Sequence, residues 1–155
     1  MKIAFIDRDG VIINEPQDTF QIDSLDKLMI LPNSIKVMKR LIAEGYKLVM
    51  VSNQNGIGSP SFPTEKFEIP QKELQRQLED EGITFYKIFV CPHFATDNCG
   101  CRKPKTGLVD EFIKNTDIDF AKSFMIGDRE TDMEFASNIG VRGFKKDSNS
   151  AFNSS

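Results

Sequence analysis

Acidic and hydroxyl side chains stand directly after three short apolar runs in this chain of 155 residues. Asp7 and Asp9 follow the first run, Ser52 follows another, and Asp128 follows a third. A single aspartate at such a position usually forms a turn or caps a helix. Two acidic clusters together with a hydroxyl indicate chemistry instead, because converging carboxylates repel one another unless a cation lies among them.

The expected cation is a hard divalent ion, because every candidate ligand is an oxygen. Such a set favours Mg²⁺, which takes one or two carboxylates and keeps the rest of its shell for water and a substrate phosphate. A carboxylate that a metal holds against a phosphate can act as a nucleophile. Side chains two residues apart on an extended strand point the same way, so Asp9 is expected to face the same substrate as Asp7, with Arg8 pointing elsewhere. One carboxylate would then attack while the other transfers the proton.

All three cysteines and the only histidine lie between residues 91 and 101. Cys91, His93, Cys99 and Cys101 offer three thiolates and an imidazole, a closed tetrahedral Zn²⁺ set, although their spacing is tighter than that of a usual zinc finger. With all four positions filled, the zinc is expected to shape the loop and to fix the direction of the basic residues that follow it. The alternative is a redox pair of Cys99 and Cys101.

The elements that must position these residues alternate between short apolar runs and amphipathic stretches, which is typical of a parallel sheet covered by helices. Five strands are predicted, at residues 2–7, 46–52, 86–91, 123–127 and 141–144. Four helices are predicted, between Pro32 and Gly45 and at residues 70–81, 106–115 and 131–139. In an open parallel sheet, ligands bind at the carboxyl ends of the strands, so this architecture would gather the acidic clusters at one edge.

The composition and the lengths of the apolar runs limit the classes of partner, location and domain organisation to be expected. Lys and Arg number 20 against 23 Asp and Glu, a formal charge of −3, which argues against nucleic acid as a partner. Apolar runs of about six residues are far shorter than the roughly 20 that a membrane helix needs. No signal peptide precedes the first run, so we expect a cytoplasmic chain with reduced thiols. One domain is expected at residues 1–146, followed by a disordered tail or linker at 147–155.

Four motifs in this chain resemble, in order, those of haloacid-dehalogenase-superfamily phosphatases. They are Asp7-Arg8-Asp9-Gly10, Ser52-Asn53, Lys103-Pro104, and Gly127-Asp128 followed by Asp132. The likeness extends over nearly the whole chain. It implies a three-layer Rossmann-like α/β fold, with a parallel sheet flanked by helices and a minimal cap that carries the zinc-binding loop.

The resemblance also assigns roles. Asp7 would be the nucleophile that forms an aspartyl-phosphate, and Asp9 the acid that protonates the leaving group and then the base that activates water. Ser52 and Lys103 would clamp the phosphate. Lys105 is the rival to Lys103, which is preferred because the motif places its lysine directly before proline.

The metal ligands are implied in the same way. Mg²⁺ would be held by the carboxylates of Asp7 and Asp128 and by the backbone carbonyl of Asp9, offsetting charge on the phosphoryl oxygens. Asp132, four residues after Asp128, would support the metal site or Lys103.

Within the superfamily, the chain is similar to the branch that holds histidinol-phosphate phosphatases and heptose bisphosphate phosphatases. The stretches at residues 15–28, 53–63 and 91–105 favour the histidinol-phosphate family, which forms the N-terminal part of a bifunctional enzyme of histidine biosynthesis and implies a fused or associated dehydratase domain. Heptose enzymes commonly carry a basic residue near position 59 or 60, whereas this chain has no Lys or Arg between Lys47 and Lys66. The alternative function is a heptose 1,7-bisphosphate 7-phosphatase.

A small phosphate ester such as histidinol phosphate also presents an ammonium and an imidazole. Glu15 is therefore expected near the mouth of the site, with Asn53, Gln54 and Arg102 lining the same entrance. The irregular stretches at residues 16–30 and 56–70, with the zinc loop, would stand in for a separate cap domain.

Two other classes of function share some of these features. A phospho-accepting signalling domain also uses an aspartate at the end of a strand with Mg²⁺, but Asp9 would speed its dephosphorylation. A zinc-stabilised binding module would not need the complete set of polar residues after the apolar runs. Turnover of an aryl phosphate with Mg²⁺ separates the phosphatase from both.

Overall fold

The computed structural model describes residues 1–152, in which five strands form one parallel sheet. The strands are β1 (Lys2–Ile6), β2 (Tyr46–Asn53), β3 (Lys87–Cys91), β4 (Phe124–Gly127) and β5 (Arg142–Lys145). Across the sheet they lie in the order β3-β2-β1-β4-β5, so the first strand is central. The expected α/β class and the five expected strands are confirmed.

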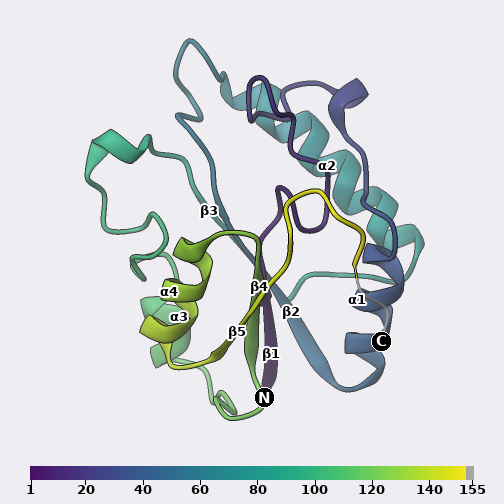
Figure 1. Ribbon diagram of the computed structural model, residues 1–155, viewed down its shortest axis with the longest axis vertical. Coiled ribbons are helices and arrows are strands. Elements are labelled where there is room, and N and C mark those ends of the chain that lie inside the picture. The colour runs from purple at the N-terminus through teal and green to yellow at the C-terminus, as the bar shows by residue number, and fades with distance from the viewer. Residues whose placement is uncertain (153–155) are drawn as a thin grey trace.

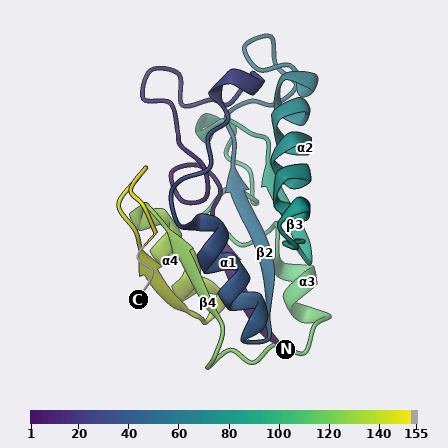
Figure 2. The same ribbon diagram turned by 90° about the vertical axis from the view of Figure 1, so that its right-hand side faces the viewer.

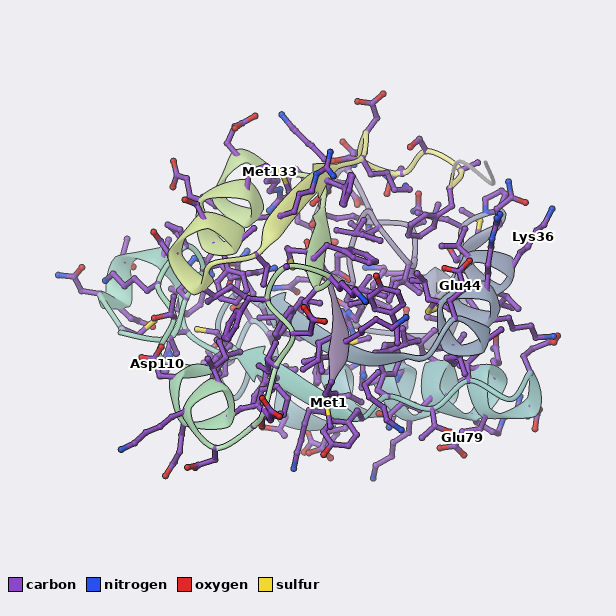
Figure 3. The ribbon with its side chains drawn as sticks, turned by 90° about the horizontal axis from the view of Figure 1, so that it is seen from below. Met1, Lys36, Glu44, Glu79, Asp110 and Met133 are labelled. Carbon is purple, nitrogen blue, oxygen red and sulfur yellow. The ribbon has the colours of Figure 1, made fainter. Side chains whose placement is uncertain are left out.

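Helices cover both faces of the sheet and make three layers (Figure 1, Figure 2). One face carries α1 (Ser34–Ala43) and α2 (Thr64–Asp80), and the other carries α3 (Asp110–Lys114) and α4 (Glu130–Ile139). Figure 3 shows the separation from below, with Lys36 and Glu79 on one side of the sheet and Asp110 and Met133 on the other. Two short 3-10 turns, η1 (Leu25–Lys27) and η2 (Ala95–Asp97), lie in the long loops.

The two layers have separate apolar cores because neighbouring residues of a strand point to opposite faces. In β1, Ala4 packs in the core that includes Met38 of α1 and Leu74 of α2. Phe5 packs in the core on the other face, with Phe135 of α4. These side chains are fully buried. A central strand buried on both faces explains the nearly continuous apolar character of β1 and β2.

Two helices differ from their predicted bounds. The helix predicted at residues 70–81 begins at Thr64, because Pro63 occupies the position before the first turn and Pro70 lies buried inside the helix. Proline is common at a helix start, which made Pro70 the expected boundary. The helix predicted at residues 106–115 is reduced to α3, because the backbone before Val109 forms a turn closed by the Val109 N–H to Thr106 carbonyl bond of 3.0 Å.

Strand register brings the carboxyl ends of the central strands to one edge, the upper edge in Figure 1. Ile6, at the end of β1, pairs with Met50 of β2 and with Ile126 of β4. The residues that follow these three strands are therefore neighbours, as expected from the pattern of apolar runs.

Residues 147–152 fold back over this edge (yellow in Figure 1). Phe152 is 7% exposed, its N–H donates to the carbonyl of Pro32 at 3.0 Å, and its carbonyl accepts from Asn33 Nδ2 at 3.0 Å. The expectation of a disordered tail or linker at residues 147–155 rests on polar composition, which does not reveal these tertiary contacts. The rest of that tail, 153–155, lies outside the described residues. No helix within residues 1–152 is long and apolar enough to cross a membrane.

Candidate active site

The centre of the site is Asp7, which follows β1 and is buried. The Nζ atom of Lys103 lies 3.2 Å from Asp7 Oδ1 and 2.7 Å from Asp132 Oδ1, and it donates to the carbonyl of Val51 at 2.8 Å. Lys105 lies elsewhere, with its Nζ donating to the carbonyl of Cys99. The structure therefore places Lys103, and not its rival, among the carboxylates.

Asp128 and Asp132 complete an acidic cluster with Asp7, in which one oxygen of each lies within 4.8 Å of the others. Asp132 Oδ2 accepts from the N–H groups of Asp128 and Arg129 at 3.1 and 3.2 Å, so this side chain orders the start of α4. Asp128 Oδ1 is buried without a hydrogen-bond partner. Buried oxygens usually have a partner, so an isolated one points to a missing ligand.

The electrostatics of the cluster fit a divalent cation. Burial raises the pKa of Asp7 well above its usual value, the nearby Lys103 opposes this, and Asp132, Asp128 and Asp9 raise it further. Burial lowers the pKa of Lys103, but attraction to Asp7 and Asp132 outweighs burial and raises that pKa overall. A single lysine cannot balance this many buried carboxylates, and a hard cation bound by Asp7 and Asp128 would do so while satisfying the free oxygen.

Asp9 is held by a different set of contacts. Arg8 Nε and Nη2 donate to the two carboxylate oxygens of Asp9 at 2.9 and 3.2 Å, and Gln54 Nε2 donates to Oδ2 at 2.8 Å. Arg8 is almost fully buried, donates to Gln71 Oε1 at 2.9 Å, and lies over the ring of Phe67 at 4.9 Å.

Arg8 does not line the pocket, which agrees with the expectation that it points elsewhere than Asp7 and Asp9, although its guanidinium bends back to contact Asp9. Strand pairing of β1 ends at Ile6, so the alternation of an extended strand no longer applies at residues 7–9. The part of the expectation that concerns Asp9 agrees with the structure, because Asp7 and Asp9 line the same pocket.

The end of β2 supports this pocket from the side. Ser52 is fully buried, and its Oγ accepts from Gln54 Nε2 at 2.8 Å. Asn53 holds the backbone of Lys103 through two hydrogen bonds, Lys103 N–H to Asn53 Oδ1 at 2.9 Å and Asn53 Nδ2 to the Lys103 carbonyl at 3.2 Å. Of the three residues expected at the entrance, Asn53 lines the pocket, Gln54 bridges Ser52 and Asp9, and Arg102 donates to the carbonyls of Gln54 and His93.

Glu15 lines the pocket and is 6% exposed. Its Oε1 lies 2.6 Å from Arg129 Nη2, and Asn149 accepts from its N–H at 2.7 Å and donates to its carbonyl at 3.0 Å. Burial raises the pKa of Glu15 to about 7, although Arg129 acts in the opposite direction. Glu15 at the rim of the site is therefore expected to lose its proton near neutral pH and not near pH 4.5.

Several residues of the site were not predicted from the sequence. Arg129 and Thr131 line the pocket, and both lie in the quoted motif at residues 127–132, so their position could have been noticed. Gln71 and Asn149 carry no such signal, because one lies on a helix and the other in a polar segment far along the chain.

The second cluster contains the thiols and the imidazole. Cys91 Sγ lies 3.1 Å from Cys101 Sγ and 3.6 Å from Cys99 Sγ, and His93 Nδ1 lies 3.2 Å from Cys101 Sγ. One donor atom from each residue lies within 4.8 Å of the others, and the three cysteines are free. Four donor atoms that converge in this way fit the ligands of a single cation.

The thiols differ in acidity. Burial raises the pKa of Cys91 to about 12. Burial acts in the same direction on Cys99, but hydrogen bonds involving Cys101 and Arg102 outweigh it and lower its pKa to about 6. A bound Zn²⁺ would hold all three as thiolates, and the donor set fits that ion.

A five-stranded parallel α/β domain with buried carboxylates and a lysine at the strand ends defines a phosphatase of the haloacid-dehalogenase type. The profile of the family "Polynucleotide kinase 3 phosphatase" matches residues 2–148. The chain belongs to this family, which confirms the expected resemblance and the expected phosphatase class.

Two relatives with similar sequences carry the same name. The "Histidine biosynthesis bifunctional protein HisB" of Campylobacter jejuni subsp. doylei is 54% identical over 144 residues, covering 93% of this chain and 41% of the relative. The protein of that name from Legionella pneumophila is 49% identical over 140 residues, covering 90% and 40%. The chain thus spans about two fifths of the length of these relatives.

Among solved structures, the D,D-heptose 1,7-bisphosphate phosphatase of B. bronchiseptica, complexed with magnesium and phosphate, has a TM-score of 0.84 and 30% sequence identity. The match covers 94% of this chain and 80% of that chain. The fold is therefore shared with a phosphatase that was crystallised with both a metal and a phosphate.

Proposed function

We propose that this domain hydrolyses L-histidinol phosphate to L-histidinol and phosphate, with Mg²⁺ and through an aspartyl-phosphate on Asp7. The observation that carries the proposal is the buried cluster in which Asp7 lies between Lys103 and a carboxylate, Asp128, with one unpaired oxygen. The names of the relatives support a role in histidine biosynthesis, and the resemblance of the sequence motifs supplies histidinol phosphate as the proposed substrate.

In the first step, a carboxylate oxygen of Asp7 attacks phosphorus, and the bond between phosphorus and the ester oxygen breaks. Asp9 gives its proton to the departing alkoxide. Lys103 Nζ and the hydroxyl of Ser52 stabilise charge on the phosphoryl oxygens. Ser52 Oγ already accepts a hydrogen bond from Gln54, which leaves its O–H free to donate to phosphate.

In the second step, Asp9, now ionised, takes a proton from water as the water attacks phosphorus. The bond between phosphorus and Asp7 breaks, which releases inorganic phosphate and regenerates both aspartates. Arg8 and Gln54 hold Asp9 during the cycle.

The residues proposed to hold Mg²⁺ are the carboxylates of Asp7 and Asp128 and the backbone carbonyl of Asp9. When bound, the ion supplies positive charge opposite the phosphoryl oxygens. Asp132 has a different role, because its Oδ1 lies 2.7 Å from Lys103 Nζ and supports the lysine.

Zn²⁺ is proposed at Cys91, His93, Cys99 and Cys101, with a structural role. Lys103 follows this loop closely, and Asn53 holds its backbone from β2. The loop and β2 together thus set the direction in which Lys103 enters the carboxylate cluster.

Specificity is proposed to involve Glu15 at the rim, which would attract the ammonium or imidazole of histidinol phosphate, with Asn53 and Arg129 beside it. The alternative substrate, heptose 1,7-bisphosphate, carries a second phosphate, which would need additional basic residues in the binding site. The segment between Lys47 and Lys66 supplies none.

The longer relatives support a further proposal about context. Because the chain spans only about two fifths of their length, we expect it to work fused to, or associated with, a dehydratase domain. Free thiols arranged for zinc support the cytoplasm as its location.

The test is kcat/KM with Mg²⁺ for four substrates in one preparation: histidinol phosphate, heptose 1,7-bisphosphate, an aryl phosphate and an oligonucleotide with a 3′-phosphate. We expect histidinol phosphate to exceed the others by at least ~10², about 2.7 kcal/mol of differential transition-state binding. A preference of that size for another substrate overturns the assignment, and no turnover of any of them overturns the phosphatase chemistry.

A further inference from the structure

Ser148 lies in the segment after β5, and its hydroxyl donates a hydrogen bond of 2.6 Å to Asp128 Oδ2. The backbone around it is anchored on both loops of the acidic cluster. The N–H of Lys146 donates to the carbonyl of Gly127 at 2.7 Å. The N–H of Asn149 donates to the carbonyl of Gly10 at 3.0 Å. The hydroxyl of Ser148 is thus presented to Asp128 from a fixed direction.

This contact gives the two carboxylate oxygens of Asp128 different surroundings. Oδ2 has the hydroxyl as its partner, whereas Oδ1 is buried and has none. Gly10 closes the other side, because a Cβ atom at that residue would lie 2.3 Å from Asp128 Oδ2. With Asp128 only 6% exposed, its carboxylate has little room to turn, and Oδ1 is the oxygen left for a ligand.

We propose that Ser148 is a positioning residue for the metal site, which orients Asp128 so that Oδ1 binds the divalent cation. The inference rests on the proposed function, since it takes Asp128 as a ligand of Mg²⁺. Partners that orient a metal ligand typically contribute 10–100-fold to metal affinity. The chain segment after the last strand is then part of the metal site.

The experiment measures Mg²⁺ affinity directly, by calorimetric titration of the zinc-loaded, magnesium-free protein. Ser148→Ala should raise the Kd for Mg²⁺ about tenfold, and it should raise the Mg²⁺ concentration for half-maximal activity to the same extent. The value of kcat at saturating Mg²⁺ should stay close to that of the unchanged protein. Ser148→Thr keeps the hydroxyl and should restore the affinity.

Ser150→Ala is the matched control, because that hydroxyl donates within the same segment to the carbonyl of Asp147 at 2.7 Å. It should leave the affinity unchanged. If Ser148→Ala does not fold, Ser148→Val can be compared with Ser148→Thr, since the two side chains have nearly the same shape and differ in the hydroxyl.

Two results overturn the inference and leave the proposed function standing. One is an unchanged Kd in Ser148→Ala, and the other is an equal loss of affinity in Ser150→Ala or in Ser148→Thr. A different result overturns the proposed function itself: the unchanged protein neither binds Mg²⁺ nor hydrolyses any of the four substrates.

Discussion

Asp7 occupies an environment that is unfavourable for a carboxylate without a cation. It is buried, its pKa is raised mainly by that burial, and Asp132 and Asp128 act in the same direction. Lys103 at 3.2 Å offsets this only in part, because the lysine is shared with Asp132. Such an arrangement is typical of a site that stabilises charge on a ligand in preference to charge on its own side chains.

Asp7→Asn is the first prediction at this scale. The change keeps the shape of the side chain and removes the nucleophile, so kcat should fall by at least ~10³-fold. The Tm should stay the same or rise, because a like charge leaves the cluster. Turnover measured with the aryl phosphate and thermal unfolding by circular dichroism check this, and a fall in Tm in proportion to the loss of activity would count against the nucleophile.

Gln71→Leu is the second prediction, and it concerns the buried Arg8 that holds Asp9. Removing the acceptor at 2.9 Å loosens Arg8, and through it the proposed acid. An alkyl phosphate needs that acid more than an aryl phosphate, whose leaving group is already a weak base. We expect kcat on histidinol phosphate to fall about tenfold, part of the 10²–10⁴ that general acids supply.

The measurement for Gln71→Leu is the ratio of the two rates, alkyl over aryl, in the same preparation. Gln77→Leu is the control on the same helix, because Gln77 bonds to Glu73, away from the site. Equal losses on both substrates would show a general structural effect and contradict the link to Asp9.

Residues at strand ends could be predicted because parallel strands that pair in register end at one edge. Asp7, Ser52 and Asp128 are therefore predicted from the sequence to lie together. Strand pairing could not locate Ser148 or Asn149, whose partners Asp128 and Glu15 lie 20 and 134 residues away along the chain. Contacts of this kind depend on where a polar segment folds back, and its composition suits a disordered segment equally well.

At the scale of elements, the loop between β3 and α3 carries the proposed zinc and leads into Lys103. Its end positions are fixed by strands, because Cys91 ends β3 and Asn53 of β2 holds the backbone of Lys103. Its middle contains only the short turn η2. A metal that joins Cys91 to Cys99 and Cys101 would therefore order the whole segment.

Removal of zinc is the third prediction. Cys99→Ser or dialysis against a strong chelator should lower the zinc content, the Tm and kcat together, because Lys103 loses its orientation. Metal analysis, thermal unfolding and aryl phosphate turnover on one sample provide the comparison. Thr96→Ala, in the exposed turn of the same loop, should change none of the three; a zinc-free protein that stays folded and fully active would contradict the prediction.

Element boundaries were harder to predict than element types. Local propensity favours Pro70 as a helix start, yet the buried side chains of Phe67 and Leu74 extend α2 through it. The helix expected at residues 106–115 is shortened for a related reason, since a turn occupies its first residues. Tertiary packing decided both cases, and it is not visible in local propensity.

For the whole molecule, burial of carboxyls makes stability depend on pH. Glu15 has a pKa near 7 in the folded protein against an ordinary 4.5, so the folded state binds its proton more tightly than the unfolded chain. The free energy of unfolding should then decrease as pH rises from about 4.5 to about 7. Asp7, whose pKa is also raised, contributes in the same direction.

Glu15→Gln is the fourth prediction, because it removes one of these two groups. The free energy of unfolding should then decrease less between pH 4.5 and 7, by on the order of 1–2 kcal/mol. This value allows for solvent screening of a group at the rim of the site. Urea unfolding of the magnesium-free protein at both pH values measures it. Glu68→Gln, an exposed change on α2, is the control, and equal slopes in all three proteins would contradict the role of Glu15.

The central position of β1 has a consequence for how the chain folds. One side of β1 pairs with β2, and the other pairs with β4, which begins only at Phe124. During synthesis, β1 to β3 can assemble early, but the second side of an apolar strand stays unpaired until most of the domain has been made. An unpaired apolar edge promotes association between chains. Shortened versions that end before β4 should therefore aggregate, so the interval before β4 is when a nascent chain most needs a chaperone.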